Sequence, residues 1–253
     1  MRQKIWILAL TGLFKLSSAW GQTTALDFKK AFAPGYTAAC QYLQSHELLI
    51  AQTLTRYGGE VRLLVSVVFP EMVRYSEVRN AIETASLEWL YVQYGPAYAN
   101  FSIGHFQMKP TFAEEIENQV RQHQLLLFQD LLPEANAPEA EIRQARIQSL
   151  KSLAGQLKYL AAFQKLLGLR FPEWTKQGAL ERVRWAAAAY NRGFTASAAE
   201  ISAWRQKSAF PYGPAHRGPQ YNYTEIAGFF WEMSTSKSLR SIRGSRGYSA
   251  LHG

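Results

Sequence analysis

The sequence contains a single cysteine, Cys40, among 253 residues. An intramolecular disulfide is therefore impossible, even in an oxidising compartment. A nucleophilic thiol needs a neighbouring base, and no residue pattern marks one. We interpret Cys40 as a small residue that packs against the apolar interior.

Cofactor and metal motifs are also missing. The chain has five histidines, none of which is spaced with cysteine or acidic residues as in a metal site: His46, His105, His123, His216 and His252. It contains no Gly-Lys-Ser/Thr phosphate loop, no Gly-x-Gly-x-x-Gly and no Gly-x-Ser-x-Gly elbow. We therefore expect neither a metal nor a cofactor.

Long apolar runs are confined to the N-terminus. Arg2 and Lys4 precede an apolar run over residues 5–14, and small residues lie just before position 22. This pattern predicts a signal peptide over residues 1–21, since the run is too short to span a bilayer; the alternative is a buried N-terminal helix. We expect an exported protein, periplasmic or extracellular, with no integral membrane segment in its mature form.

Positive charge is concentrated at the two ends. The net charge is +9, and residues 236–253 form a basic tail that holds four cationic residues and no acid: Lys237, Arg240, Arg243 and Arg246. Little net charge remains between the ends, which argues against a nucleic-acid-binding surface. The tail is either attracted to anionic wall polymers or membranes, or is a flexible solvated terminus.

Strand signals are scarce, whereas helical periodicity is frequent after residue 36. We predict an all-α, mainly helical fold with few or no strands, in one domain over residues 22–235. Capping residues, apolar stripes and turn residues predict three long helices and two loops: helices over residues 76–94, 142–167 and 180–190, and loops over 95–104 and 207–222.

The segment over residues 61–69 is ambiguous because its β-branched residues suit a strand as well as a buried helix. A lone short strand would have no pairing partner, so the helix is favoured. Pro70 is expected to break or kink this helix, which would place Glu71 at its end.

Three short motifs follow one another in the sequence. Glu71 follows the apolar helix, and Tyr190, Asn191 and Gly193 form the last motif. Between them lie residues that form a Gly-x-x-Gln-like element followed by proline and alanine: Gly104, Phe106, Gln107, Pro110 and Ala113. Over residues 60–232 this order resembles the soluble lytic transglycosylase and goose-type lysozyme superfamily. A further weak match is Tyr223.

The resemblance implies a lysozyme-like fold that binds peptidoglycan glycan strands and cleaves the linkage between N-acetylmuramic acid and N-acetylglucosamine. Glu71 would be the catalytic acid and base. Substrate-binding positions would be shared among six residues of the later motifs: Gly104, Phe106, Gln107, Tyr190, Asn191 and Tyr223.

The residue types fit this chemistry, although each has a plainer explanation. A glycosidic acid must stay protonated near neutral pH, which apolar neighbours favour; Glu71 could instead begin a helix or pair with Arg74. Gln107 can hold a sugar acetamido group or hydroxyl, or it can brace its loop. Tyr190 can orient the glutamate or be a buried tyrosine with a satisfied hydroxyl.

Several positions depart from the family pattern. Met72 replaces the usual serine, His105 and Lys109 replace apolar residues, and the gap before Gln107 is longer. The inserted helix carries Glu83 and Glu88, which rival Glu71. We prefer Glu71 because it alone follows the apolar helix.

The residues after position 21 include just two aspartates, Asp27 and Asp130, neither of which lies near a motif. Inverting hydrolysis needs a second carboxylate to activate water, whereas a lytic transglycosylase needs only one. The sequence therefore favours a lytic transglycosylase. A hydrolase that uses Glu77, Glu83 or Glu88 as base stays open, as does a degenerate glycan-binding or envelope-scaffold protein.

Overall fold

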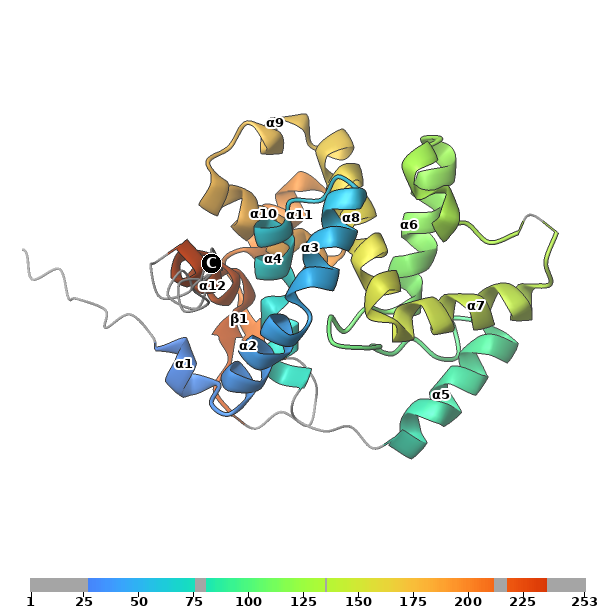
Figure 1. Cartoon of the computed structure of the whole chain (residues 1–253), viewed down its shortest axis with the longest axis horizontal. Coiled ribbons are helices and arrows are strands. Elements are labelled where there is room, and N and C mark those ends of the chain that lie inside the picture. Colours follow the sequence, from blue (N-terminus) through green and yellow to red (C-terminus); the bar gives the residue numbers. More distant parts are fainter. Residues whose placement is uncertain (1–26, 76–80, 135, 212–217, 236–253) are drawn as a thin grey trace, which may run out of the picture.

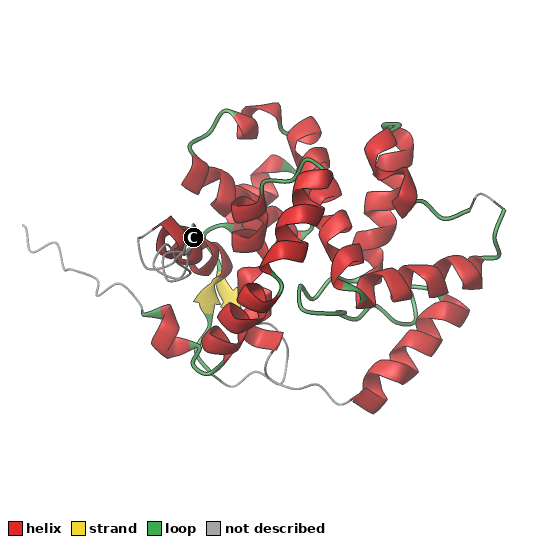
Figure 2. Ribbon diagram, viewed as in Figure 1, coloured by secondary structure: helices red, strands yellow, loops and turns green. Residues whose placement is uncertain are grey.

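The computed structural model describes residues 27–75, 81–134, 136–211 and 218–235. Helices make up 71% of these residues and strands 4%, which confirms the all-α class (Figures 1 and 2). The predicted signal peptide, the start of the predicted helix at Ser76 and the basic tail lie outside the described residues. The elements are α1 (Phe28–Ala31), α2 (Gly35–Ser45), α3 (Glu47–Arg56), α4 (Val61–Tyr75), α5 (Ala81–Tyr94), α6 (Pro110–Gln122), the 3-10 helix η1 (Leu126–Leu131), α7 (Glu139–Lys151), α8 (Leu153–Arg170), α9 (Pro172–Thr175), α10 (Ala179–Arg192), α11 (Ala198–Trp204), β1 (Ser208–Phe210), β2 (Tyr221–Asn222) and α12 (Tyr223–Thr235).

Helix α4 forms the centre of the core and packs against α2, α10 and α12. Every residue from Leu63 to Val73 is buried, so the helical interpretation of the apolar segment is confirmed. The expectation that Pro70 ends the helix is wrong, because α4 continues to Tyr75. An interior proline costs about 3 kcal/mol. Burial of several large apolar side chains, at roughly 1.5–3 kcal/mol each, readily offsets that loss.

The predicted single helix over residues 142–167 is two helices, α7 and α8. Ser152 has extended backbone (ψ 138°), and its hydroxyl accepts a hydrogen bond from the Gly155 N–H at 3.0 Å. Serine favours such N-cap positions over helix interiors. The chain turns so tightly that a Cβ on Gly155 would lie 2.0 Å from the Ser149 carbonyl oxygen. Apolar periodicity continued through this break and therefore did not reveal it.

Helices α5, α6 and α7 lie together on one side of the molecule (Figure 1) and surround a buried ion-pair cluster. The Arg146 guanidinium donates to both Glu117 carboxylate oxygens at 2.9 and 2.6 Å and to Glu114 at 3.0 Å. Tyr91 donates to Glu114 and Tyr159 donates to Glu117, each at 2.7 Å. Each charged group of the cluster is therefore paired, as buried charges must be.

The two predicted loops have different outcomes. Residues 95–102 contain neither helix nor strand, as expected. The region over 207–222 contains the short antiparallel pair β1–β2, whose register places Ser208 opposite Asn222.

Cys40 packs against the core, and burial raises the pKa of its thiol. None of the helices in the described part of the chain is both long and apolar enough to cross a membrane.

Candidate active site

Four of the predicted site residues meet at one cavity of about 750 Å³, lined by Glu71, Gln107, Tyr190 and Asn191 among others. Its walls come from α4, the loop over residues 100–109, the first turns of α6, and the end of α10 with the residues that follow. We call it the Glu71 cavity. Exposed residues such as Asn100 and Lys109 also line it, so the cavity opens to solvent.

Glu71 is the most deeply placed ionisable residue of this cavity. Only 9% of its surface is exposed, and its sequence neighbours Pro70 and Met72 are buried as well. Glu71 lies inside α4, so it does not begin a helix, which was one of its two plainer explanations. Its position inside α4 gives the side chain a rigid base, as a catalytic group requires.

Tyr190 connects α10 to the motif loop. Its hydroxyl donates a hydrogen bond to the Phe106 carbonyl oxygen at 2.7 Å. Burial raises the pKa of this hydroxyl well above its usual value, and the charge of the nearby Glu71 carboxylate raises it further. Tyr190 therefore stays protonated at neutral pH, and it holds the loop next to the glutamate.

The motif loop is a tight turn closed by two hydrogen bonds between Ile103 and Met108, at 2.8 and 3.1 Å. Gly104 and Gln107 both have positive φ, +67° and +51°. The Gln107 side chain donates to the Gly104 carbonyl oxygen at 2.9 Å. Of its two proposed roles, loop bracing is thus the one visible in the structure, while the residue also lines the cavity.

Gln156, which no sequence motif marked, anchors this loop from the side away from the cavity. It lies in the first turn of α8 and is 2% exposed. Its amide oxygen accepts from the Phe106 N–H at 3.0 Å, and its nitrogen donates to the Ile103 and Leu150 carbonyl oxygens at 3.3 and 2.6 Å. The break between α7 and α8 places Gln156 in the first turn of α8, within hydrogen-bonding distance of the motif loop. The expected single helix over residues 142–167 did not predict this position.

Close contact with Gln156 also explains Gly104. A Cβ at this position would lie 1.5 Å from the Gln156 side-chain nitrogen, in addition to the strain of a positive φ. Glycine is the residue that permits both so close a backbone approach and a positive φ at this position. It acts on the loop's shape, since Gly104 is not among the cavity-lining residues.

The remaining predicted site residues support the cavity or lie behind it. Phe106 is fully buried, and it takes part through its backbone groups. Asn191 accepts a hydrogen bond from the Trp204 indole at 2.9 Å, which ties α10 to α11. Tyr223 is 2% exposed and donates to the Val67 carbonyl oxygen of α4 at 3.2 Å, away from the cavity lining. Gly193, with φ +112°, lies directly after the last residue of α10 and ends the helix.

A second carboxylate in the Glu71 cavity is Glu115 of α6, which the motifs did not mark. It accepts a hydrogen bond from the Gln119 amide at 2.9 Å. The proposed rival Glu88 instead pairs with Lys151 at 2.6 Å and does not line the cavity. Glu77 and the side chain of Glu83 lie outside the described residues.

His105, one of the departures from the family pattern, is part of an aromatic stack. Its ring lies 3.6 Å from the Tyr42 ring, centroid to centroid, and 4.2 Å from that of Tyr75, while Tyr42 stacks on His46 at 4.1 Å. Burial, with a smaller contribution from His46, lowers the pKa of His105 to about 4. The neutral ring thereby fastens the motif loop to α2 and α4.

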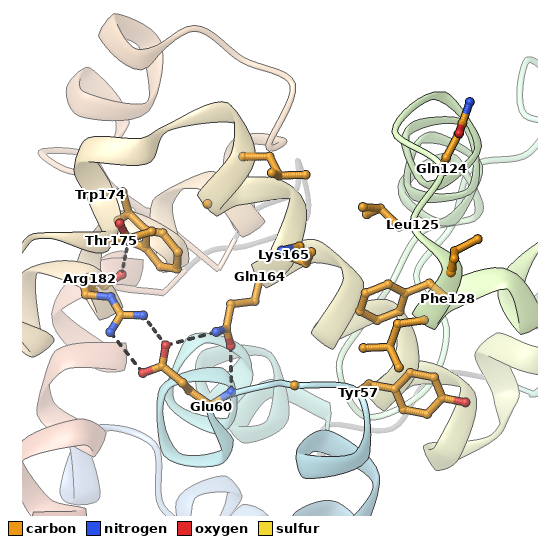
Figure 3. A pocket seen from close by; sticks show the side chains of 15 residues that line it. Tyr57, Glu60, Gln124, Leu125, Phe128, Gln164, Lys165, Trp174, Thr175 and Arg182 are labelled. Atoms are coloured by element: carbon orange, nitrogen blue, oxygen red, sulfur yellow. Dashed lines mark hydrogen bonds and ion pairs between the residues drawn. The ribbon is translucent and has the colours of Figure 1, made fainter.

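A second cavity, of about 840 Å³, is lined by the connection between α3 and α4, the residues that follow α6, and by η1, α8, α9 and Arg182 of α10 (Figure 3). We call it the Glu60 cavity. Its lining includes Tyr57, the exposed side chains of Leu126 and Leu127, and Glu60. The Glu60 carboxylate accepts hydrogen bonds from Arg182 and, at 3.1 Å, from Gln164.

No protein family, curated protein or solved structure matched the chain when it was compared with each. Within the described ranges, no group of three or more His, Cys, Asp or Glu side chains is placed to hold a metal ion.

Proposed function

We propose that this protein is a peptidoglycan lytic transglycosylase with a lysozyme-like fold, and that Glu71 is its catalytic acid and base. The observation that supports this most is a buried glutamate in the wall of a solvent-open cavity, next to the motif residues Gln107 and Tyr190. The cavity volume of about 750 Å³ is typical of a small-ligand site. The order of the motifs, which resembles the soluble lytic transglycosylase superfamily, supports the same function.

In the proposed reaction Glu71 first donates its proton to the glycosidic oxygen, and the bond from that oxygen to C1 of N-acetylmuramic acid breaks. The 6-hydroxyl of the same sugar then attacks C1 and gives its proton to the Glu71 carboxylate. The products are an N-acetylglucosamine end with a free 4-hydroxyl and a 1,6-anhydro-muramic acid. Glu71 regains a proton, so the reaction requires no second carboxylate and consumes no water.

Hydrolysis is a second candidate because Glu115 supplies another carboxylate to the same cavity. In that case Glu115 would activate a water molecule that attacks C1, and the product would carry a reducing end. A catalytically inactive glycan-binding or envelope-scaffold protein is the third. Met72 and the longer gap before the motif loop motivate that alternative.

The deciding experiment is mass spectrometry of the products released from purified sacculi by the chain lacking residues 1–21 and by its Glu71→Gln variant. Anhydro-muropeptides from the unmodified protein alone are the expected result. Reducing-end sugars that disappear in a Glu115→Gln variant would establish hydrolysis. If both proteins still bind sacculi but release no product, the result would support the catalytically inactive glycan-binding role.

If the function is as proposed, the protein works outside the cytoplasm on the glycan strands of the wall. Secretion is checked by locating the full-length chain and a variant that begins at residue 22. Export of the former and cytoplasmic retention of the latter are expected.

A further inference from the structure

The ionisable side chains of the Glu71 cavity are predominantly cationic. Arg74 from α4, Lys109 just before α6 and Arg192 at the end of α10 line it, against the carboxylates of Glu71 and Glu115. If Glu71 is protonated before the reaction, as the proposed mechanism requires, three cations face a single carboxylate. Such a cavity favours an anionic ligand.

Lys109 and Arg192 are the two exposed cations of the cavity, and the charge of Lys109 is the more available to a ligand. It is exposed and forms no ion pair with any residue of the described ranges. Arg192, in contrast, pairs with Glu200 at 3.0 Å and lies over the Trp204 ring at 5.7 Å from its centroid.

The backbone of Lys109 is held in place although its side chain is exposed. Its carbonyl oxygen accepts hydrogen bonds from the Phe112 and Ala113 N–H groups at 3.0 and 3.3 Å. The preceding residue, Met108, is buried and bonded to Ile103. The lysine side chain therefore starts from a fixed point on the cavity wall.

We propose that Lys109, assisted by Arg74, binds a carboxylate that the substrate carries beside the bond to be cleaved. This inference rests on the proposed function. In peptidoglycan the lactyl ether on C3 of muramic acid provides such a group on the sugar whose C1 reacts. The carboxylate belongs to the lactyl group itself where the peptide has been removed, and to the stem peptide where it is present. A charge-assisted hydrogen bond from lysine suits either source.

The test measures binding in the Glu71→Gln background, so that no turnover interferes. Three ligands are compared: glycan strands with stem peptides, the same strands after amidase treatment, and a chito-oligosaccharide, which has no carboxylate. Lys109→Met keeps an unbranched stem of nearly the same length and removes the charge, and Lys109→Arg restores the charge. Lys165→Met is the matched control, because Lys165 is an exposed lysine in the lining of the Glu60 cavity.

We expect Lys109→Met to weaken binding of at least one carboxylate-bearing ligand about tenfold, as for the loss of one hydrogen bond to a charged group. Binding of the chito-oligosaccharide should stay unchanged, and Lys109→Arg should recover most of the loss. Weakening with amidase-treated strands would identify the lactyl carboxylate, and weakening only with intact strands would identify the stem peptide.

Equal binding of all three ligands by Lys109→Met and its parent would overturn the inference. An equal loss in Lys165→Met would also overturn it, since the effect would then be one of overall charge. In the active protein, Lys109→Met should raise KM while kcat stays within about threefold. If the active protein releases no product from sacculi, the proposed function fails, and the binding comparison still decides the role of Lys109.

Discussion

The Glu71 cavity and the Glu60 cavity have similar volumes, about 750 and 840 Å³, and each has a glutamate in its lining. They differ in the state of that glutamate. Glu71 is 9% exposed within a buried helix, whereas the Glu60 side chain is 47% exposed and paired with Arg182. Volume alone would favour the Glu60 cavity, whereas the proposed chemistry favours the Glu71 cavity. Burial of a carboxyl group next to a tyrosine is the feature that suits acid catalysis.

The two cavities also differ in how their walls are held. Around Glu71, backbone turns are locked by Gln156, Tyr190 and the stacked His105. Around Glu60, the wall includes Leu126 and Leu127, which are 74% and 54% exposed. Precise positioning is needed for chemistry. In the Glu71 cavity the hydrogen bonds fix a backbone loop next to the glutamate, whereas around Glu60 they join the glutamate itself to Arg182 and Gln164.

Exchange of the two glutamates for glutamine should show the largest contrast. Glu71→Gln removes the proposed proton donor and should lower the release of products from sacculi by about 100- to 10,000-fold. Glu60→Gln weakens an exposed ion pair, so activity should stay within about twofold and stability within about 1 kcal/mol. Turnover assays and thermal unfolding of both variants check this, and equal losses in the two would remove the distinction between the cavities.

Alanine at the positive-φ glycine of the motif loop and at the one that lines the Glu60 cavity should give the next largest contrast. Gly104→Ala meets both backbone strain and the Gln156 side chain, so the free energy of unfolding should fall by about 2–4 kcal/mol. Gly58, with φ +69°, has nothing within 4 Å of the new Cβ, so Gly58→Ala should cost only about 1 kcal/mol.

A double-mutant cycle separates the two contributions at Gly104. In a Gln156→Ala background the Cβ of Gly104→Ala has room, so the added loss should shrink to about that of Gly58→Ala. Denaturant unfolding measures all four proteins. Additive losses would mean that Gln156 is not what excludes a side chain at position 104.

The buried His105 ring should make the stability of the protein depend on pH below about 6.5. Its pKa is about 4 in the folded protein, below the usual value of 6.5, because the ring is buried and lies near His46. The unfolded chain therefore binds a proton first as the pH falls. The contribution of the neutral His105 ring to the free energy of unfolding is fully present above pH 6.5. It should decrease by on the order of 1–2 kcal/mol towards pH 4, after allowance for solvent screening.

The matched variant for this effect is His105→Phe, which keeps an aromatic ring between Tyr42 and Tyr75. The difference in unfolding free energy between parent and variant should change between pH 6.5 and 4 and stay constant above that range. A constant difference across the whole range would show that His105 does not titrate in this window.

Removal of one hydroxyl from each cavity should have the smallest effects. Tyr190→Phe loses the hydrogen bond to the Phe106 carbonyl oxygen, and Tyr57→Phe loses the one to Asp130. Each should lower the free energy of unfolding by about 1 kcal/mol. Only Tyr190→Phe should also lower activity, by about tenfold, because its loop borders Glu71. Similar activity in the two variants would limit Tyr190 to a structural role.

Local sequence patterns were sufficient for the helical class and for much of the site. The apolar segment before Glu71, the end of α10 at Gly193 and the turn at Gly104 each follow from residue types that act over a few positions. Periodicity, helix-ending glycine and positive φ are local properties. Glu71, Gln107, Tyr190 and Asn191 were expected from the order of the motifs, which resembles the soluble lytic transglycosylase superfamily, and the structure places all four at one cavity.

The tertiary structure decided the features that depend on contacts between distant segments. Continuation of α4 through Pro70 depends on its burial by α2, α10 and α12, and the anchoring role of Gln156 depends on a loop about fifty residues earlier. The same holds for Glu115, which no motif marked, and for Lys109, which was noted only as a departure from the family pattern; both line the cavity. Sequence thus determined which local elements form and which side chains are suited to chemistry. Packing determined which of them share a cavity, because close approach in space has no signature in the spacing of a single chain.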